Sequence, residues 1–207
     1  MSDKPKIQVI KKGPYVVQNI PSVKDSEDNP IERDNPSLCR CGASKSKPFC
    51  DGTHASIDFD DTTSDNGPTK EFEGKDITII DNQKICCHAG YCVKGAEKAF
   101  FTFDGDKRIS HPDKETKEKI IETIRKCPSG SLAYKLNGEL SDKYFDKAEV
   151  QILKDGPILV RGGTTLKNDE GREPIAKDHY VLCRCGASKN KPFCDGKHKD
   201  IKFNDDE

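Results

Sequence analysis

A stretch of 16 residues occurs twice in this chain with only two differences. Residues 39–54 read CRCGASKSKPFCDGTH, and residues 183–198 read CRCGASKNKPFCDGKH. Each copy carries three Cys and one His in the spacing C-x-C-x8-C-x3-H. Three thiolates and one imidazole form a full tetrahedral ligand set for a metal. Because the set recurs in a second copy, we expect a fold organised around two metal centres.

The duplication extends beyond these two loops. Residues 7–17 read IQVIKKGPYVV, and residues 150–160 read VQILKDGPILV. Each is a β-branched run, a turn with Gly-Pro, and a second apolar run, which predicts strand–turn–strand. Gly13 and Gly156 are 143 residues apart, while Cys39 and Cys183 are 144 apart. The near-constant offset indicates that a whole unit was duplicated, strands and loop together.

We therefore divide the chain into a first unit at 1–60, a middle segment at 70–147 outside the repeat, and a second unit at 148–207. The polar stretches 21–36 and 60–69 are expected to be irregular connectors. In the middle segment, 77–80 and 100–103 are predicted strands, and 112–126 is a predicted helix with Pro near its start. Asn137-Gly138 between apolar runs predicts a hairpin. The expected class is α/β (α+β).

Composition narrows the functional classes. Only 32% of the residues are hydrophobic, so this chain has little core for its length and metal centres could help to hold it together. There is no apolar signal-peptide core and no stretch long enough to span a membrane. We expect a cytoplasmic location, where clustered Cys indicate metal ligands rather than disulfides. The net charge of −1 argues against a nucleic-acid partner.

Spacing alone leaves zinc and iron–sulfur chemistry both open, since the two share these ligands. The order C-R-C-G-A-S-K followed by P-F-C-D-G-[T/K]-H, however, closely resembles the CDGSH iron–sulfur family. The resemblance implies one [2Fe–2S] cluster in each loop. Cys39 and Cys41 would hold one iron, and Cys50 and His54 the other. In the second loop, the same pairs would be Cys183 with Cys185 and Cys194 with His198. A neutral imidazole in place of a thiolate raises the reduction potential, as in Rieske centres.

The same resemblance suggests an architecture. CDGSH proteins are often homodimers with one cluster in each subunit. A duplicated chain can supply both halves itself, so we expect a monomer that forms an intramolecular pseudo-dimer, with the middle segment inserted between the halves. Asp51 and Asp195 are expected to cap a helix or to bind backbone amides, and Ser44 and Ser188 to donate to sulfur. His179 has no partner pattern and is expected at the surface or at a cap.

The middle segment carries a second Cys pattern. It reads CCHAGYC at 86–92 and CPSG at 127–130, which resembles the divergent single-cluster ferredoxin domains with C-x-H-x3-C, a helix and C-P-S-G. Three thiolates are present, from Cys86, Cys92 and Cys127. A [3Fe–4S] cluster needs only three ligands, whereas a [4Fe–4S] cluster could take His88 or Cys87 as the fourth. The remaining interpretation is a degenerate domain whose Cys side chains only fill the core.

We expect an iron–sulfur protein that acts in single-electron transfer, redox sensing or cluster transfer, with an unidentified redox partner or cluster acceptor. The alternative is a zinc-stapled interaction module without a redox role. Because no nucleophile triad, phosphate-binding loop or carboxylate pair stands out, we do not expect an enzyme.

Overall fold

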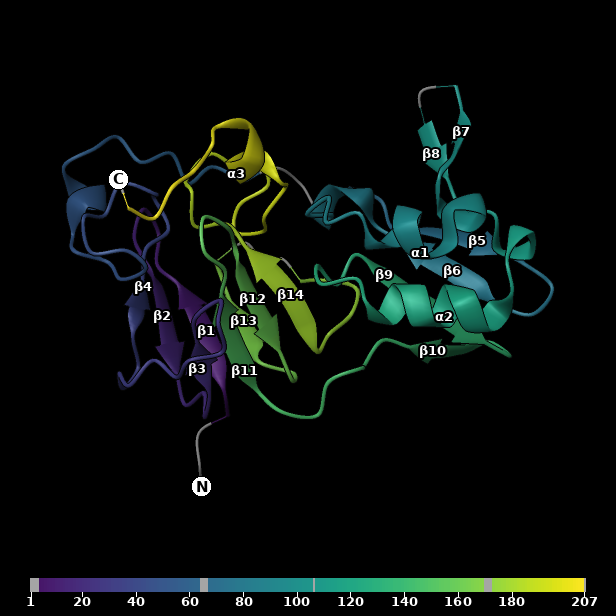
Figure 1. Ribbon diagram of the computed structural model, residues 1–207, viewed down its shortest axis with the longest axis horizontal. Helices are drawn as coiled ribbons and strands as arrows, with labels where there is room; N and C mark the ends of the chain where they lie inside the picture. Colours follow the sequence, from purple (N-terminus) through teal and green to yellow (C-terminus); the bar gives the residue numbers. More distant parts are fainter. Residues whose placement is uncertain (1–3, 64–66, 106, 170–172, 207) are drawn as a thin grey trace.

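The computed structural model describes residues 4–63, 67–105, 107–169 and 173–206. Figure 1 shows a β-rich part made from both ends of the chain and, beside it, the middle segment with its two longer helices. The protein is thus a mixed α+β structure of small sheets, in which two repeated units flank the middle segment. None of the helices in the described ranges has the length and apolar character to cross a membrane.

The first repeated unit forms most of one four-stranded sheet. The predicted strand pair is confirmed as an antiparallel hairpin of β1 (Lys6–Val9) and β2 (Tyr15–Gln18), and β4 (Ser37–Leu38) pairs with β2. The remaining edge strand is β13 (Thr165–Lys167), which pairs parallel to β1 and comes from the other unit.

The second unit repeats this arrangement. β11 (Glu149–Ile152) and β12 (Ile158–Arg161) form the hairpin, and β14 (His179–Leu182) pairs with β12. The parallel edge strand is β3 (Val23–Lys24), which comes from the first unit. Each unit therefore gives one strand to the other's sheet, and β3 is a short strand within a connector that the sequence predicted to be irregular. Reciprocal strand exchange of this kind is what a pseudo-dimer within one chain requires.

The two sheets share one hydrophobic core. Tyr15, Val17 and Leu38 of the first unit lie in the same cluster as Val160 and Leu182 of the second. Alternate residues of the strands point into it, as the burial of every second residue in β1 and β11 shows. The Tyr15 hydroxyl also crosses between units, donating to the carbonyl oxygens of Cys183 at 2.8 Å and Pro192 at 3.0 Å. Among the described residues, the apolar strands of both units thus pack into the same cluster.

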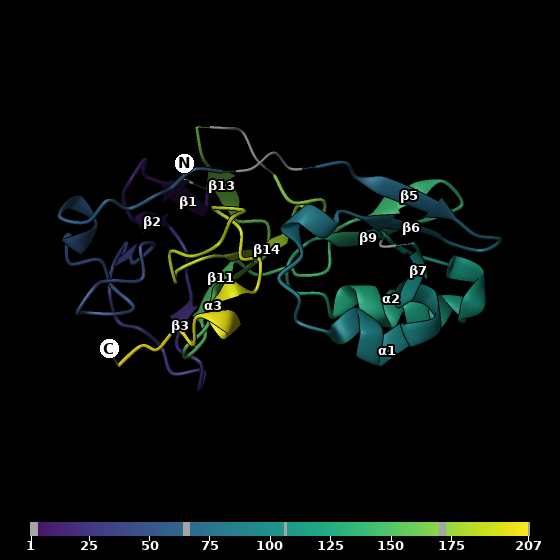
Figure 2. The same ribbon diagram turned by 90° about the horizontal axis from the view of Figure 1, so that it is seen from above.

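The middle segment has a sheet of its own, in the order β10-β9-β6-β5. Its strands are β5 (Lys70–Glu73), β6 (Thr78–Asp81), β9 (Leu132–Leu136) and β10 (Glu139–Ser141). The hairpin between β9 and β10 confirms the Asn137-Gly138 prediction, since both residues have positive φ, of 50° and 81°. Two helices, α1 (Tyr91–Phe100) and α2 (Lys117–Arg125), pack together on one side of this sheet, as Figure 2 shows from above.

Helix α1 was not predicted. Gly90 and Gly95 interrupt the helical pattern, but Gly95 is where α1 approaches α2, and a Cβ there would lie 2.5 Å from the Thr123 hydroxyl. Residues 100–103, predicted as a strand, instead span the end of α1 and the start of β7 (Thr102–Asp104), which pairs with β8 (Lys107–Ile109).

The helix predicted at 112–126 is shorter than expected. Residues Pro112–Lys114 form a separate 3-10 turn, and α2 begins after Thr116, whose hydroxyl accepts from the Lys119 amide. The helix therefore starts at the threonine N-cap and not at the proline. The remaining short helical turns are Gln83–Ile85 and, in the two loops, Thr53–Ala55 and α3 (Lys197–Asp200).

Candidate metal centres

The first loop brings its four candidate ligands together as two pairs. The Sγ atoms of Cys39 and Cys41 lie 3.9 Å apart, and the Cys50 Sγ lies 3.2 Å from the His54 Nδ1. The His54 ring is carried on the helical turn Thr53–Ala55, which begins after Gly52 at a φ of 89°. The Cys39–Cys41 pair directly follows β4, whereas the Cys50–His54 pair lies at the turn. The two pairs thus come from separate backbone segments.

The second loop has the same arrangement. The Cys183 and Cys185 Sγ atoms are 3.7 Å apart, and the Cys194 Sγ lies 3.4 Å from the His198 Nδ1. In both loops, Nδ1 is thus the histidine ring nitrogen that faces the cysteine sulfur. The CDGSH resemblance implied the same pairs, two sulfurs in one and one sulfur with one nitrogen in the other. That they bind metal stays a prediction.

The short contacts in each loop join its ligands two by two. Across the described residues, no three His, Cys, Asp or Glu side chains converge closely enough to hold a single metal. A mononuclear zinc site needs all four ligand atoms around one point. Two pairs of ligands are the donor set of a binuclear centre, in which each metal takes two protein ligands.

Each Cys pair is prepared for deprotonation. A hydrogen bond between the two sulfurs lowers the pKa of the Cys39 thiol and raises that of Cys41. In the second loop the same bond lowers the pKa of Cys185 and raises that of Cys183. In each pair one thiol is thus the easier of the two to deprotonate, and metal binding would remove both protons.

Asp51 and Asp195 hold the loops in shape. The two carboxylate oxygens of Asp51 accept from the Lys45 amide at 2.8 Å and the Thr53 amide at 3.0 Å, and Asp195 does the same with Lys189 and Lys197. Hydrogen bonds from Thr53 lower the pKa of Asp51 well below its usual range. Of the two predicted roles, amide binding is the one observed. The Ser44 and Ser188 hydroxyls donate to the carbonyls of Phe49 and Phe193, not to sulfur.

The arginine between the first two ligands was missed by the sequence reasoning. Arg40 is 3% exposed and donates to the carbonyl of Ile10 at 3.0 Å and to Asp61 at 3.3 Å. Arg184 is 1% exposed and donates to the carbonyl of Leu153 at 2.6 Å and to Asp205. Each guanidinium thus ties a Cys-Arg-Cys segment to the hairpin of its own unit. The one signal in the sequence was that the arginine recurs in Cys-Arg-Cys in both loops.

The two loops meet at their second cysteines. Cys41 and Cys185 form an isolated antiparallel bridge, which joins the two units next to both candidate centres. The residues that follow are Gly42 and Gly186, at φ of 81° and 76°. A Cβ at Gly42 would lie 2.4 Å from the Cys185 carbonyl oxygen, and one at Gly186 would lie 2.2 Å from that of Cys41. This close approach excludes any side chain at the two positions.

The predicted cysteine ligands of the middle segment line one small pocket. Cys86, Cys92 and Cys127 face it, together with Cys87, whereas His88 is exposed and does not line it. Burial raises the pKa of Cys86 to about 11 and that of Cys92 less strongly. The Cys127 Sγ lies 3.4 Å from the Ser129 hydroxyl and 3.5 Å from that of Ser131.

A buried ion pair borders this cavity. Arg108 donates to the Asp81 carboxylate at 2.9 Å and reaches the Cys92 Sγ at 3.8 Å. Burial raises the pKa of Asp81 despite this pairing. The Arg108 Nε and the Asp81 Oδ1 are buried without a hydrogen-bond partner. A half-buried guanidinium whose buried Nε has no partner, beside three cysteines, suits a negatively charged group between them.

His179 is fully buried, contrary to the surface position expected from the sequence. Its Nε2 lies 2.9 Å from the Cys127 carbonyl, and its Nδ1 lies 2.7 Å from the Asp178 carboxylate. Because a carbonyl can only accept, Nε2 carries a proton. Burial opposes ionisation of Asp178, but hydrogen bonds from His179 and two backbone amides outweigh it and lower the pKa. His179 thus links the second unit to the middle segment at a predicted ligand.

Comparison with known families supports the iron–sulfur interpretation. A model described as iron-binding zinc finger CDGSH type matches residues 12–55 and 155–199. A second model, described as divergent 4Fe-4S mono-cluster, matches residues 72–137. The chain belongs to the CDGSH iron-binding family. Both resemblances predicted from the sequence are confirmed, and the chain is an iron–sulfur protein with a divergent 4Fe–4S segment between its two CDGSH units.

Among curated proteins, the uncharacterized protein YjdI of Escherichia coli strain K12 is 33% identical over 70 residues. The match covers 34% of this chain and 90% of YjdI, and the YjdI of strain O157:H7 matches to the same extent. No solved structure matches significantly. These relatives carry no described activity that could be transferred.

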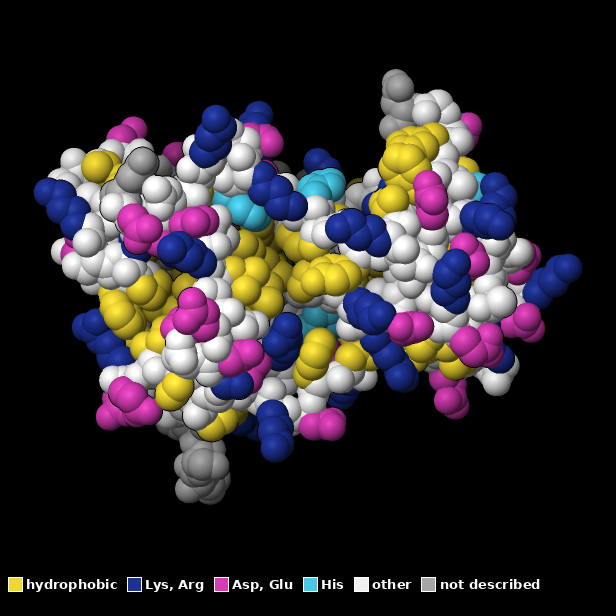
Figure 3. Space-filling view, viewed as in Figure 1, with side chains coloured by type: hydrophobic (Ala, Val, Ile, Leu, Met, Phe, Trp, Pro, Cys, Tyr) yellow, Lys and Arg dark blue, Asp and Glu magenta, His cyan; other side chains and the backbone are white. Residues whose placement is uncertain are grey.

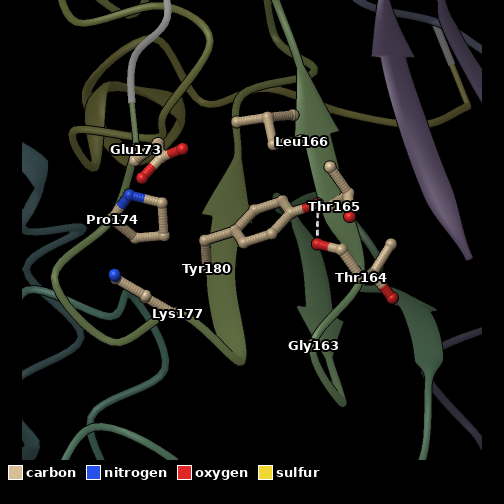
Figure 4. Close-up of a pocket in the computed structure, with 8 residues that line it drawn as sticks. All are labelled: Gly163, Thr164, Thr165, Leu166, Glu173, Pro174, Lys177 and Tyr180. Carbon is tan, nitrogen blue, oxygen red and sulfur yellow. Dashed lines mark hydrogen bonds between the residues drawn. The ribbon is translucent and has the colours of Figure 1, made fainter.

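A further cavity of about 150 Å³ lies away from the CDGSH ligands, beside β13 and β14. Figure 4 shows Tyr180 at its centre, with its hydroxyl donating to the Thr164 carbonyl at 3.0 Å. Its polar lining comes from Glu173, Lys177 and threonines, with no Cys or His among the described lining residues. We assign it no part in the metal chemistry.

Proposed function

We propose that this protein carries single electrons on two [2Fe–2S] clusters, one in each CDGSH loop. The observation that carries the proposal is the arrangement of each loop's ligands in two pairs, Cys with Cys and Cys with His. Such a cluster, when bound, accepts and returns one electron. The alternative is a zinc-stapled module, in which all four ligands of a loop would surround one ion.

The protein's own residues set how the sites would behave. Nδ1 of His54 and of His198 would be the one neutral ligand in each loop, which raises the reduction potential relative to four thiolates. Arg40 and Arg184 hold the Cys-Arg-Cys segments rigidly, so little rearrangement would accompany a change of charge. We propose a carrier rather than an enzyme, acting as a single chain because the shared core supplies both halves.

Cluster transfer to an acceptor protein is a second candidate function. It is favoured by the accessibility of the first loop, where Cys41, Cys50 and His54 are only half-buried. For the middle segment we propose a third cluster, held by Cys86, Cys92 and Cys127. Cys87 lines the cavity and is therefore the better placed of the two candidate fourth ligands.

A redox titration followed by visible absorption tests the carrier function. We expect reversible bleaching by about one electron per CDGSH loop, with full recovery on reoxidation. The double variant Cys50→Ser, Cys194→Ser removes one ligand from each loop and should lose this part of the signal, leaving at most that of the middle segment. A colourless wild-type protein, or a colour that never returns after reduction, would contradict the proposal.

A further inference from the structure

The two CDGSH loops are nearly identical in sequence but differ in burial. Cys194 is 1% exposed, whereas its counterpart Cys50 is half-buried. Phe193 is fully buried, whereas Phe49 is only partly so, and Asp195 is more buried than the exposed Asp51. Since the residues themselves are the same, the difference must come from what packs against each loop.

The cover over the second loop is the middle segment. Cys87 forms a small apolar cluster with Cys194, Leu159 and Val181, and it is itself 5% exposed. The adjacent backbone approaches the loop so closely that a Cβ at Gly196 would lie 3.1 Å from the Cys87 carbonyl oxygen. At the equivalent Gly52, the space around a Cβ is open.

Two side chains of the second unit bind the carbonyls of this cover. The Asn190 Nδ2 donates to the Lys84 carbonyl, and the Lys199 Nζ donates to the His88 carbonyl at 3.2 Å. At the offset of 144 residues, the first unit has Ser46 and Ala55 in these positions. The repeats therefore diverge at the positions where the second one contacts the middle segment.

The strands below the loops diverge in the same way. Val181 is 1% exposed beneath the cover, while Ser37 is its half-exposed counterpart in the first unit. On the other side, the amides of Ile175 and Ala176 donate to the Gly130 carbonyl, which docks the middle segment a second time. In Figure 3, hydrophobic side chains gather where the β-rich part and the middle segment meet.

We propose that the middle segment is a built-in cover for the second CDGSH loop, which makes that loop the retained site and the first loop the exchange site. The inference rests on the proposed function for the identity of the bound group, but the cover itself does not. A partner protein or chelator would reach the first loop directly, whereas the second loop opens only when the middle segment lifts away.

Pulsed alkylation of the metal-loaded protein during chelation tests the proposal. A soluble iron chelator is added, and samples are pulsed with iodoacetamide and read by peptide mass spectrometry, so that each cysteine reports when its own loop loses metal. We expect Cys50 to become reactive roughly tenfold sooner than Cys194, since burial and two hydrogen bonds must be overcome in the second loop.

The decisive variant gives the second loop the residues of the first, Asn190→Ser with Lys199→Ala. It should speed the reaction of Cys194 by roughly fivefold and leave Cys50 unchanged, so that Cys50 reports on the integrity of the fold. Lys199→Ala alone, a change at the surface, should shift Cys194 in the same direction by less. The matched control Ser46→Asn with Ala55→Lys should change neither rate, because both positions are exposed and the space beside Gly52 is open.

Equal rates for Cys50 and Cys194 in the wild type would overturn the proposal. The proposal would also fail if neither variant raised the alkylation rate of Cys194 relative to that of Cys50. The readout depends on metal release and not on the kind of metal. If the loops held zinc, the proposed function would fail while the difference between the loops would remain measurable.

Discussion

We expect the wild type to lose metal below neutral pH, and replacing both His54 and His198 by Cys should remove most of that loss. A ring nitrogen binds metal only when unprotonated, so protons compete with iron for Nδ1. This contribution is fully present above the free histidine pKa of about 6.5 and is lost as the pH falls below it. We expect the wild-type bleaching rate to rise by roughly tenfold per pH unit below that value, and the double variant to stay nearly flat.

The direction of the pKa shift at His198 agrees with this sign. Burial and the neighbouring Lys199 lower the pKa of His198, so the neutral ring is favoured in the folded state. The folded state therefore loses stability as the pH falls below the pKa of histidine in the unfolded chain. Stopped-flow absorption between about pH 5 and 8 is the measurement. Each single variant serves as a control that should retain one acid-sensitive phase. The same pH profile in the wild type and the double variant would refute histidine ligation.

Alanine at Gly42 or at Gly186 should disrupt both metal centres at once. Either Cβ would collide with a backbone carbonyl of the opposite loop, at 2.4 Å or 2.2 Å, and the left-handed φ adds strain. Because backbone atoms cannot rotate away, the Cys41–Cys185 bridge must open. We expect a loss of about 3 kcal/mol or more in the free energy of unfolding, measured by chemical denaturation, together with reduced iron in both loops.

Gly138→Ala is the matched control. Its φ is 81°, the same as at Gly42, but nothing lies within 4 Å of its Cβ position. It should therefore cost only the backbone strain, about 1 kcal/mol. If Gly42→Ala costs no more than Gly138→Ala, the bridge between the loops is not a structural requirement.

The repeat made much of this fold predictable. An identical apolar pattern around Gly13 and Gly156 gave both hairpins, and the constant offset indicated that they belong to equivalent units. The candidate ligands could be predicted from the repeated spacing of three Cys and one His, because that set is typical of a metal site. The strand exchange could not be predicted, because β3 is only two residues long. It depends on pairing with a strand 127 residues further along the chain.

The contacts of the middle segment were equally hidden. His179 lies in an ordinary apolar strand, and only the fold brings it to Cys127. The unequal burial of the two loops could not be read from two nearly identical stretches, because it arises from Cys87 and the carbonyls beside it. The sequence did contain one signal, the differences at Ser46 and Asn190 and at Ala55 and Lys199, but their meaning depends on knowing what they touch.

We propose that each CDGSH loop holds a binuclear iron–sulfur centre. The most direct test is the iron, acid-labile sulfide and zinc content of anaerobically purified protein, compared with the Cys50→Ser, Cys194→Ser variant. We expect the wild type to exceed the variant by about four iron and four sulfide per chain, with little zinc in either. A difference of about two zinc per chain with no sulfide would contradict the claim.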